Sequence, residues 1–277
     1  QEQLQEEVVK IMTKKRLQNL FLATILFLLY LPIIILAVYS FTDSAMIGSI
    51  GHFSLKNYIF LSKSDELRQM IAGTVILALV VSVLSVILGT AGAIGSFYSN
   101  SKLKNTIQII NQIPVVNADV VTGFSICVLL IVFFHMDKNT YIPLIIGLVS
   151  LCSPFVYLSV IPKLKQMDPQ LYEAALDLGC KPMRAIRKII LPQLLPGIVS
   201  GFMMSVTLTL DDYFISTYTK PAVFDTISTY VVNATKGART EIKTALWALS
   251  TIIFIIVVIA VVFMNISASK NVRGHNK

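Results

Sequence analysis

Three aspartates lie inside long apolar segments of the sequence, where carboxylates could bind a cation. Asp119 lies in the segment 106–134, and the neighbours Asp211 and Asp212 lie in the segment 197–218. An ionised aspartate near the centre of a membrane-spanning helix costs roughly 2.5–3.5 kcal/mol, so such residues mostly mark a pathway and face the protein interior. At a rise of about 1.5 Å per residue, Asp119 and Asp211 each lie about 20 Å from the inner end of their segment, hence at similar depth. The pattern predicts a cation path.

Aromatic residues follow the two neighbouring acids. Tyr213, Phe214 and Tyr218 could supply cation–π contacts to a bound cation. Adjacent residues on a helix point about 100° apart, so we expect only one of Asp211 and Asp212 to face the path, and the sequence favours neither. An alternative stays open, in which the acids lie at the outer interface or pair with a basic residue of a partner helix.

Six apolar segments must position these residues. Of the 277 residues, 55% are hydrophobic and 14% are charged, whereas soluble domains carry roughly 25% charged residues. A helix needs about 20 apolar residues to cross the hydrocarbon core of a bilayer. The segments of that length are 20–41, 70–98, 106–134, 141–161, 197–218 and 244–269. The predicted fold class is therefore all-α, a polytopic membrane protein with six transmembrane helices.

The distribution of basic residues predicts the orientation of these helices. With the N-terminus in the cytoplasm, 15 of the 23 Lys and Arg residues fall in cytoplasmic segments, as the positive-inside rule requires. The first apolar segment is longer than the roughly 7–15 apolar residues of a signal peptide, so we expect it to be retained as a span. The predicted organisation is a cytoplasmic segment 1–19, a six-helix permease domain 20–269, and a cytoplasmic tail 270–277.

The sequence lacks the motifs of a self-contained enzyme. No Gly-Lys dipeptide occurs, so a Walker A phosphate loop cannot form, and neither HExxH nor GxSxG is present. The three histidines lie far apart, and the three cysteines form no CxxC pair. The net charge of +8 lies in short loops without a basic face interleaved with aromatic residues, which argues against nucleic acid. We expect no catalytic residue, no metal site and no cofactor in this chain.

The residue pattern of the longest cytoplasmic loop, residues 162–192, predicts two short helices joined by a glycine. Asp168 has the residue type and position of an N-cap. Gly179 supplies the left-handed conformation that a tight reversal after a helix needs. The dipeptide Leu191-Pro192 is expected to end the second helix.

The first of these helices combines acidic residues with a face of small side chains. Glu173 is followed by Ala174 and Ala175, and a face of alanines lets another surface approach closely. A basic amphipathic hairpin could instead lie on anionic lipid headgroups. The acidic first helix favours a docking site for a soluble protein.

This loop resembles the EAA loop of the permease subunits of ABC importers. The matching residues are Glu173, Ala174, Ala175, Gly179, Ile189, Ile190, Leu191 and Pro192. The resemblance implies the type I ABC-importer fold. It also implies that the loop is a coupling hairpin seated in a cleft of a separate ATPase, which holds the ATP and Mg²⁺. In that arrangement Glu173 contacts the ATPase and Gly179 shapes the elbow of the hairpin.

Further stretches resemble the permease subunits of spermidine/putrescine importers. They are residues 117–123, 208–216, 227–230 and 245–251. The chain departs from that pattern at Ala118, where proline is expected, and at Lys220-Pro221, where glycine-proline is expected. The resemblance implies polyamine import along a path formed by Asp119, Asp211, Asp212, Tyr213 and Tyr218. A flexible polyamine with apolar spacers fits separated carboxylates and aromatic walls.

The same resemblance implies a set of partners and a location. The partners are two copies of a PotA-like ATPase, a PotB-like second permease and a PotD-like extracytoplasmic binding protein. The location is the bacterial cytoplasmic (inner) membrane, crossed several times, with both termini in the cytoplasm. Two alternatives stay open: the same framework with another cargo, such as a thiamine-like compound or a metal chelate, and an ion-coupled secondary transporter that uses the acids as proton relays.

Overall fold

The chain is helical throughout the part that its structure describes. This structure is a computed structural model, and it describes residues 2–42, 51–117, 119–168, 170–236, 247–255 and 258, with the side chains of 2–16 and 234–236 left out. Apart from an isolated bridge between Thr42 and Phe53, every regular element in these ranges is a helix. The all-α prediction is confirmed. The chain divides into two compact units. One consists of Asp65–Gly237, and the other consists of Gln1–Ser64 together with Ala238–Lys277.

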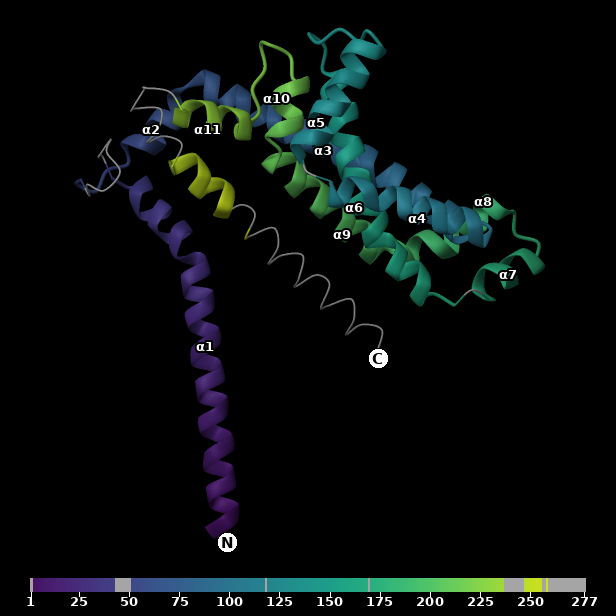
Figure 1. The fold of residues 1–277 in the computed structure, drawn as a ribbon, viewed down its shortest axis with the longest axis horizontal. Helices are drawn as coiled ribbons and strands as arrows, with labels where there is room; N and C mark the ends of the chain where they lie inside the picture. The colour runs from purple at the N-terminus through teal and green to yellow at the C-terminus, as the bar shows by residue number, and fades with distance from the viewer. Residues whose placement is uncertain are drawn as a thin grey trace. The chain divides into compact units, whose positions relative to one another are not determined.

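The larger unit contains most of the helices (Figure 1). In chain order they are α3 (Asp65–Phe97), α4 (Ser101–Val116), α5 (Asp119–Cys127), the π-helix η1 (Val128–Phe133), α6 (Ile142–Gln166), α7 (Gln170–Asp177), α8 (Pro182–Ala185), the π-helix η2 (Ile186–Ile190), α9 (Leu191–Asp211), α10 (Phe214–Thr219) and α11 (Ile227–Lys236).

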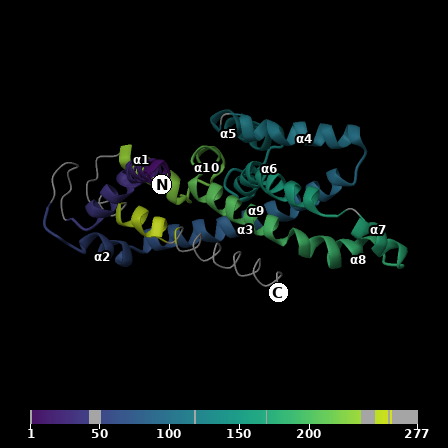
Figure 2. The ribbon, with the colours of Figure 1, turned by 90° about the horizontal axis from the view of Figure 1, so that it is seen from below.

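Helices α3, α6 and α9 pack against one another and form the centre of this unit (Figures 1 and 2). Glycines allow the close approach. A Cβ on Gly89 of α3 would lie 2.7 Å from the Cβ of Val156 in α6, and a Cβ on Gly201 of α9 would lie 3.1 Å from Val156 Cγ1. Val156 itself is completely buried. A small residue on α3 and another on α9 therefore hold both helices against the same point of α6.

Within the described residues, four helices are long and apolar enough to cross a membrane. They are Leu17–Ser40, Asp65–Phe97, Ile142–Gln166 and Pro182–Asp211. A bent pair, α4 followed by α5 and η1, would be a fifth span. The expected sixth span, 244–269, lies mostly outside the described residues. The described helices are consistent with six spans, and that number stays a prediction.

The expectation that residues 106–134 form one straight helix is wrong. Helix α4 ends at Val116, and α5 with η1 runs at 105° to it. Pro114 has no N–H to donate in the last turn of α4, and Asn117 is extended with ψ 150°. The Asn117 side chain donates to Thr122 Oγ1 at 3.1 Å. Asp119 consequently lies at the beginning of a helix, and its depth cannot be measured along a continuous span.

The smaller unit contains α1 (Glu2–Ser40), α2 (Lys56–Lys63) and a helical stretch at residues 247–255. The Asn57 side-chain amide of α2 donates to the carbonyls of Ser40 and Thr42, both at 3.0 Å. The Tyr39 and Trp247 rings meet edge to face at 5.4 Å between centroids. These contacts join α2 and the 247–255 helix to the end of α1.

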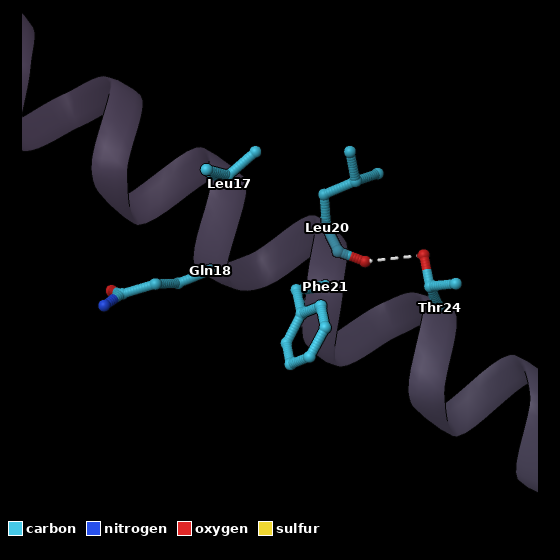
Figure 3. A pocket seen from close by; sticks show the side chains of 5 residues that line it. All are labelled: Leu17, Gln18, Leu20, Phe21 and Thr24. Carbon is cyan, nitrogen blue, oxygen red and sulfur yellow. Dashed lines mark hydrogen bonds between the residues drawn. The ribbon is translucent and has the colours of Figure 1, made fainter.

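A shallow pocket runs along one face of α1 (Figure 3). Its lining residues are Leu17, Gln18, Leu20, Phe21 and Thr24. Thr24 Oγ1 donates to the Leu20 carbonyl at 2.9 Å, and all five side chains are exposed. Because these residues come from two turns of one helix in a candidate span, the pocket suits a lipid chain or a partner helix and has no catalytic groups.

Candidate functional site

The loop that resembles a coupling hairpin forms the predicted pair of helical segments. Asp168 Oδ1 accepts the N–H of Gln170 at 2.9 Å, which is the bond of a helix N-cap. Helix α7 begins at Gln170, and Pro169 lies outside the described residues. The N-cap prediction for Asp168 is confirmed.

The reversal after α7 depends on one glycine. Gly179 has φ +80°, in the left-handed region, and its N–H donates to the Leu176 carbonyl at 2.9 Å. The Cys180 N–H reaches back to the Ala175 carbonyl at 3.0 Å. Together these bonds form a Schellman motif, which satisfies carbonyl groups at the helix end. The prediction of a left-handed glycine is confirmed.

Replacing Gly179 with alanine should destabilise this reversal. A Cβ at Gly179 would meet no atom within 4 Å, so the cost comes from the backbone conformation alone. We expect Gly179→Ala to lower the free energy of unfolding by about 1 kcal/mol. Unfolding in mixed detergent micelles measures this value. Gly95→Ala is the matched control, because Gly95 also faces open space but lies within α3; there alanine should stabilise the helix by roughly 0.5–1 kcal/mol. Equal effects of the two changes would contradict the argument.

The second helix of the hairpin does not end where expected. Leu191 and Pro192 were predicted to terminate it, but the helix continues from Pro182 to Asp211. The π-helix η2 lies just before Pro192. Its wider turn accommodates a proline that would otherwise clash with the carbonyl four residues earlier. The hairpin is therefore continuous with the membrane-crossing helix α9.

One face of the hairpin points away from the rest of the unit. Glu173 and Ala174 are exposed, and the tip carries Leu178, which is 88% exposed, and Met183. Ala175, predicted to share the docking face, is instead buried. The exposed face thus combines a carboxylate with exposed apolar side chains.

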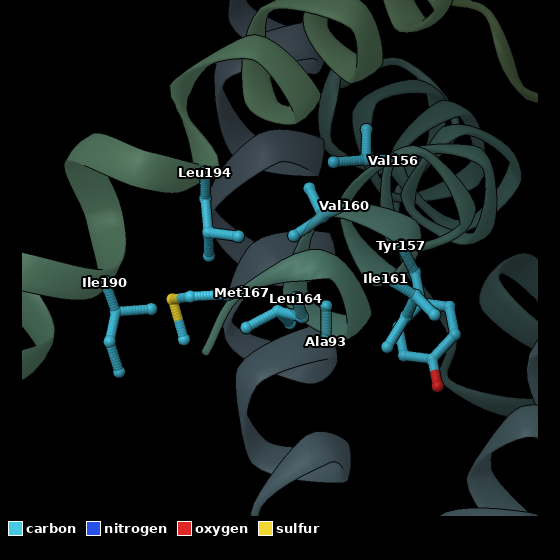
Figure 4. Close-up of a cluster of buried hydrophobic side chains, with 9 residues drawn as sticks. All are labelled: Ala93, Val156, Tyr157, Val160, Ile161, Leu164, Met167, Ile190 and Leu194. Atoms are coloured by element: carbon cyan, nitrogen blue, oxygen red, sulfur yellow. The ribbon is translucent and has the colours of Figure 1, made fainter. Parts of the chain in front are cut away.

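The opposite face fixes the hairpin to the helical core. The Tyr172 ring of α7 packs on Tyr98 at 4.8 Å between centroids, just after the end of α3. Ile190 of η2 and Met167, which precedes α7, lie in a buried cluster with residues of α3, α6 and α9 (Figure 4). Its members are Ala93, Val156, Tyr157, Val160, Ile161, Leu164, Met167, Ile190 and Leu194. A displacement of the hairpin would therefore act directly on these three helices.

The sequence interpretation did not predict the contact between Tyr98 and Tyr172. Tyr172 directly precedes Glu173, and Tyr98 directly follows α3. An aromatic residue inside a docking motif was a usable signal for an inward anchor. Its partner could not be found, because 74 positions separate the two residues in the chain.

The three acids occupy helix ends rather than helix centres. Asp119 is the first described residue of α5, where the helix dipole favours a carboxylate. Asp211 is the last residue of α9. Both side chains are exposed in the isolated chain. Each carboxylate is therefore accessible to a ligand or to a partner subunit.

Asp212 has a different role from its neighbour. It is only 9% exposed, and its two carboxylate oxygens accept the N–H groups of Ser216 at 2.7 Å and Ile215 at 3.4 Å. These bonds cap the beginning of α10. The Asp212 carbonyl accepts the Ser228 hydroxyl at 2.5 Å. The structure thus places Asp212 in a structural cap and leaves Asp211 exposed, a choice that the sequence did not decide.

Helices α5 and α10 bring aromatic residues of the two segments together. The two helices pack against each other. The Tyr218 ring of α10 meets Phe124 of α5 edge to face at 5.8 Å. Tyr213 and Tyr218 are both half-buried. Aromatic rings of this kind can contribute cation–π contacts to a bound organic cation.

Removing the Asp212 carboxylate, which caps α10, should lower the stability of the protein, whereas removing the exposed Asp211 carboxylate should not. We expect Asp212→Ala to lower the free energy of unfolding by about 1 kcal/mol, since it leaves N–H groups of α10 without an acceptor. Asp212→Asn keeps an acceptor oxygen and should retain most of that stability. Asp211→Ala is the neighbouring control and should change stability by less than about 0.5 kcal/mol. Unfolding in mixed micelles measures all three, and a larger loss for Asp211→Ala would contradict the assignment.

Comparison with known proteins gives concordant matches for sequence and fold. Residues 85–272 match the family described as binding-protein-dependent transport system inner membrane component. The spermidine/putrescine transport system permease protein PotC of Haemophilus influenzae is 29% identical over 262 residues, which cover 94% of this chain and 99% of the relative. The putrescine transport system permease protein PotI of Escherichia coli K12 is 27% identical over 232 residues, 81% of each chain.

The fold matches a chain in the crystal structure of a bacterial ABC transporter involved in the import of the acidic polysaccharide alginate. The TM-score is 0.67 at 20% sequence identity, and the match covers 90% of this chain and 94% of that chain. This likeness confirms the predicted ABC-importer permease fold.

Proposed function

The chain belongs to the family of binding-protein-dependent transport system inner membrane components, and from this we propose that it is the permease subunit of an ATP-driven polyamine importer. The observation that carries the cargo assignment is the similarity to the permease named PotC, which extends over 94% of the chain. The geometry supports it, because Asp119 and Asp211 are exposed at helix ends, and the tyrosines that follow Asp211 in the chain are half-buried. Separated carboxylates can pair with the separated ammonium groups of a di- or tricationic chain, and carboxylates in membrane segments mostly mark such pathways.

The proposed assembly contains the partners that the sequence predicts. Two copies of a PotA-like ATPase hold ATP and Mg²⁺, a PotB-like permease completes the membrane part, and a PotD-like binding protein delivers the polyamine. This chain contributes no catalytic residue. Both of its termini lie in the cytoplasm of a bacterial cell, on the same side as the coupling hairpin.

The proposed mechanism uses the connection between the hairpin and the core. Glu173 and the apolar tip of the hairpin seat in the ATPase, and Gly179 holds the elbow. Closure of the ATPase on ATP shifts the hairpin, and the shift reaches α3, α6 and α9 through Tyr172 and the buried cluster around Ile190. Because α9 is continuous with the hairpin and ends at Asp211, the movement can change the accessibility of the acids from one side of the membrane to the other.

Uptake into proteoliposomes tests this function. The complex is reconstituted with binding protein outside and either ATP or ADP inside, and radiolabelled putrescine and spermidine are the substrates. We expect uptake with ATP only, unaffected by a protonophore, since the acids bind cargo rather than relay protons. Uptake that persists with ADP and collapses with the protonophore would instead establish an ion-coupled transporter. Transport of thiamine or a metal chelate in place of polyamines would keep the ATP-driven permease and change its cargo.

A further inference from the structure

The segment between α10 and α11 holds the ammonium group of a lysine against a carboxylate and a carbonyl. The lysine is Lys220, just after α10. Lys220 Nζ lies 2.8 Å from Asp225 Oδ1 and donates to the Phe224 carbonyl at 2.9 Å. The Lys220 side chain is only 15% exposed, whereas the Asp225 side chain is 41% exposed. The lysine side chain is therefore mostly enclosed, whereas the side chain of its partner carboxylate is partly open to solvent.

The fold holds these acceptors in place independently of the lysine. The Thr229 hydroxyl of α11 donates to Asp225 Oδ1 at 3.2 Å. The Phe224 ring packs on the backbone of α3, because a Cβ on Gly73 would lie 2.7 Å from Phe224 Cε2. The Tyr141 ring meets Phe224 edge to face at 5.3 Å. A carboxylate and a carbonyl, both on a segment held by contacts with α11, α3 and Tyr141, thus converge on the ammonium group.

The segment that carries the site is bonded to Asp212, the neighbour of the exposed Asp211. Ser228, three residues after Asp225, donates to the Asp212 carbonyl at 2.5 Å. The N–H of Ile227 donates to Thr74 Oγ1 of α3 at 3.2 Å. These bonds hold the beginning of α11 against α3 and against the end of α9, so Asp225, which directly precedes this part of the chain, is fixed relative to both helices.

The occupant has the chemistry of the proposed cargo. A lysine side chain is four methylene groups ending in an ammonium group, which is also the structure of an aminobutyl arm of putrescine or spermidine. A polyamine ammonium carries the same three donors as Lys220 and can make the same two bonds. Exchange between them leaves no buried charge unpaired if the long, flexible lysine side chain turns to solvent.

We propose that Asp225 and the Phe224 carbonyl form an alkylammonium-binding site beside Asp212, and that Lys220 is a tethered competitor for it. Lys220 occupies the site until a polyamine ammonium displaces it. The competition weakens polyamine binding there, so the cargo is passed on rather than retained. The identity of the natural ligand rests on the proposed function, whereas the alkylammonium site rests on the contacts of Lys220.

Equilibrium dialysis of the assembled complex in lipid nanodiscs, without binding protein, tests the site directly. The probes are radiolabelled n-butylammonium and putrescine. Lys220→Gly removes both the competitor and its volume, which leaves a space of the size of n-butylammonium. We expect both probes to bind at least about tenfold more tightly than to the wild type, since they gain two hydrogen bonds that involve charged groups.

Two matched variants separate the site from a general effect of charge. Lys220→Met removes the same charge but fills the space, so the gain in affinity should be lost. Asp225→Asn, added to Lys220→Gly, removes the carboxylate and should return binding to the wild-type level. If the Lys220→Gly complex does not assemble, Lys220→Ala with n-propylammonium as probe makes the same comparison.

Two results would overturn the site. In the first, the Lys220→Gly complex binds both probes no more tightly than the wild type. In the second, the gain in probe affinity persists when Asp225→Asn is added to Lys220→Gly. Either result would show that the ion pair between Lys220 and Asp225 only stabilises the structure. The outcome is distinct from the fate of the proposed function, because n-butylammonium would still bind the glycine variant if the natural cargo were not a polyamine. Conversely, ATP-dependent polyamine uptake by the wild type would persist if the Lys220 site were disproved.

Discussion

Glu173→Lys should abolish co-purification of the ATPase while the chain still inserts and folds. Glu173 lies on the exposed face of α7, beside Ala174 and away from the buried cluster that anchors the hairpin. Reversal of a charge at the centre of a docking surface leaves its partner unpaired, and such changes cost roughly 2–5 kcal/mol of binding free energy. We therefore expect at least about a 30-fold weaker association of the ATPase. Affinity purification of the tagged permease, followed by quantification of the ATPase, measures it.

The matched control for this variant is Asp65→Lys. Asp65 begins α3 and is 86% exposed, in a weak ion pair with Arg68 at 3.6 Å. The same change of charge there should leave ATPase recovery unchanged, since surface pairs of this kind contribute at most about 1 kcal/mol. Normal recovery of the ATPase by Glu173→Lys would refute the assignment of the hairpin as the coupling element.

The second large effect concerns the exposed acids. The double variant Asp119→Asn with Asp211→Asn should reduce polyamine uptake at least tenfold while the complex still assembles. Each change removes a charge-assisted contact to an ammonium group, worth about 1.5–3 kcal/mol. Both residues are exposed, so amides of the same size should not disturb packing. Initial uptake rates into proteoliposomes, normalised to assembled complex, give the result.

Asp65→Asn provides the control for this double variant, because it removes an exposed carboxylate far along the sequence from the path. Its uptake should equal that of the wild type. Unchanged transport by the Asp119 and Asp211 double variant would show that these acids serve assembly or the membrane interface. Transport lost only together with assembly would point to the same conclusion.

Local sequence patterns predicted the hairpin well, because its bonds join residues a few positions apart. The Asp168 cap and the left-handed Gly179 depend on residue types that favour one backbone conformation. The prediction that the second helix ends at Pro192 was wrong, because the preceding π-helix accommodates the proline within a continuous helix. A shift from α to π hydrogen bonding has no clear signature in residue types.

The acids show what a local pattern leaves undecided. The helical repeat predicts that Asp211 and Asp212 point in different directions, but it does not indicate which of the two is buried. The answer depends on the extended backbone at Asp212, which ends α9 and lets its carboxylate cap α10. Likewise, the equal-depth argument assumed a straight helix through Asp119, and the break after Val116 removes that assumption. The contact of Lys220 with Asp225 could not be predicted either, because it depends on the conformation of the turn between α10 and α11.

The most direct test of the whole account is the ATPase activity of the reconstituted complex with its binding protein, titrated with spermidine, putrescine, thiamine and a neutral sugar. We predict stimulation by spermidine and putrescine, and none by thiamine or the sugar, since only polyamines offer the separated ammonium groups that the carboxylates of Asp119 and Asp211 can bind. Stimulation by thiamine or sugar, with none by polyamines, would contradict the polyamine assignment. A complex that contains no ATPase at all would contradict the coupling role of the hairpin.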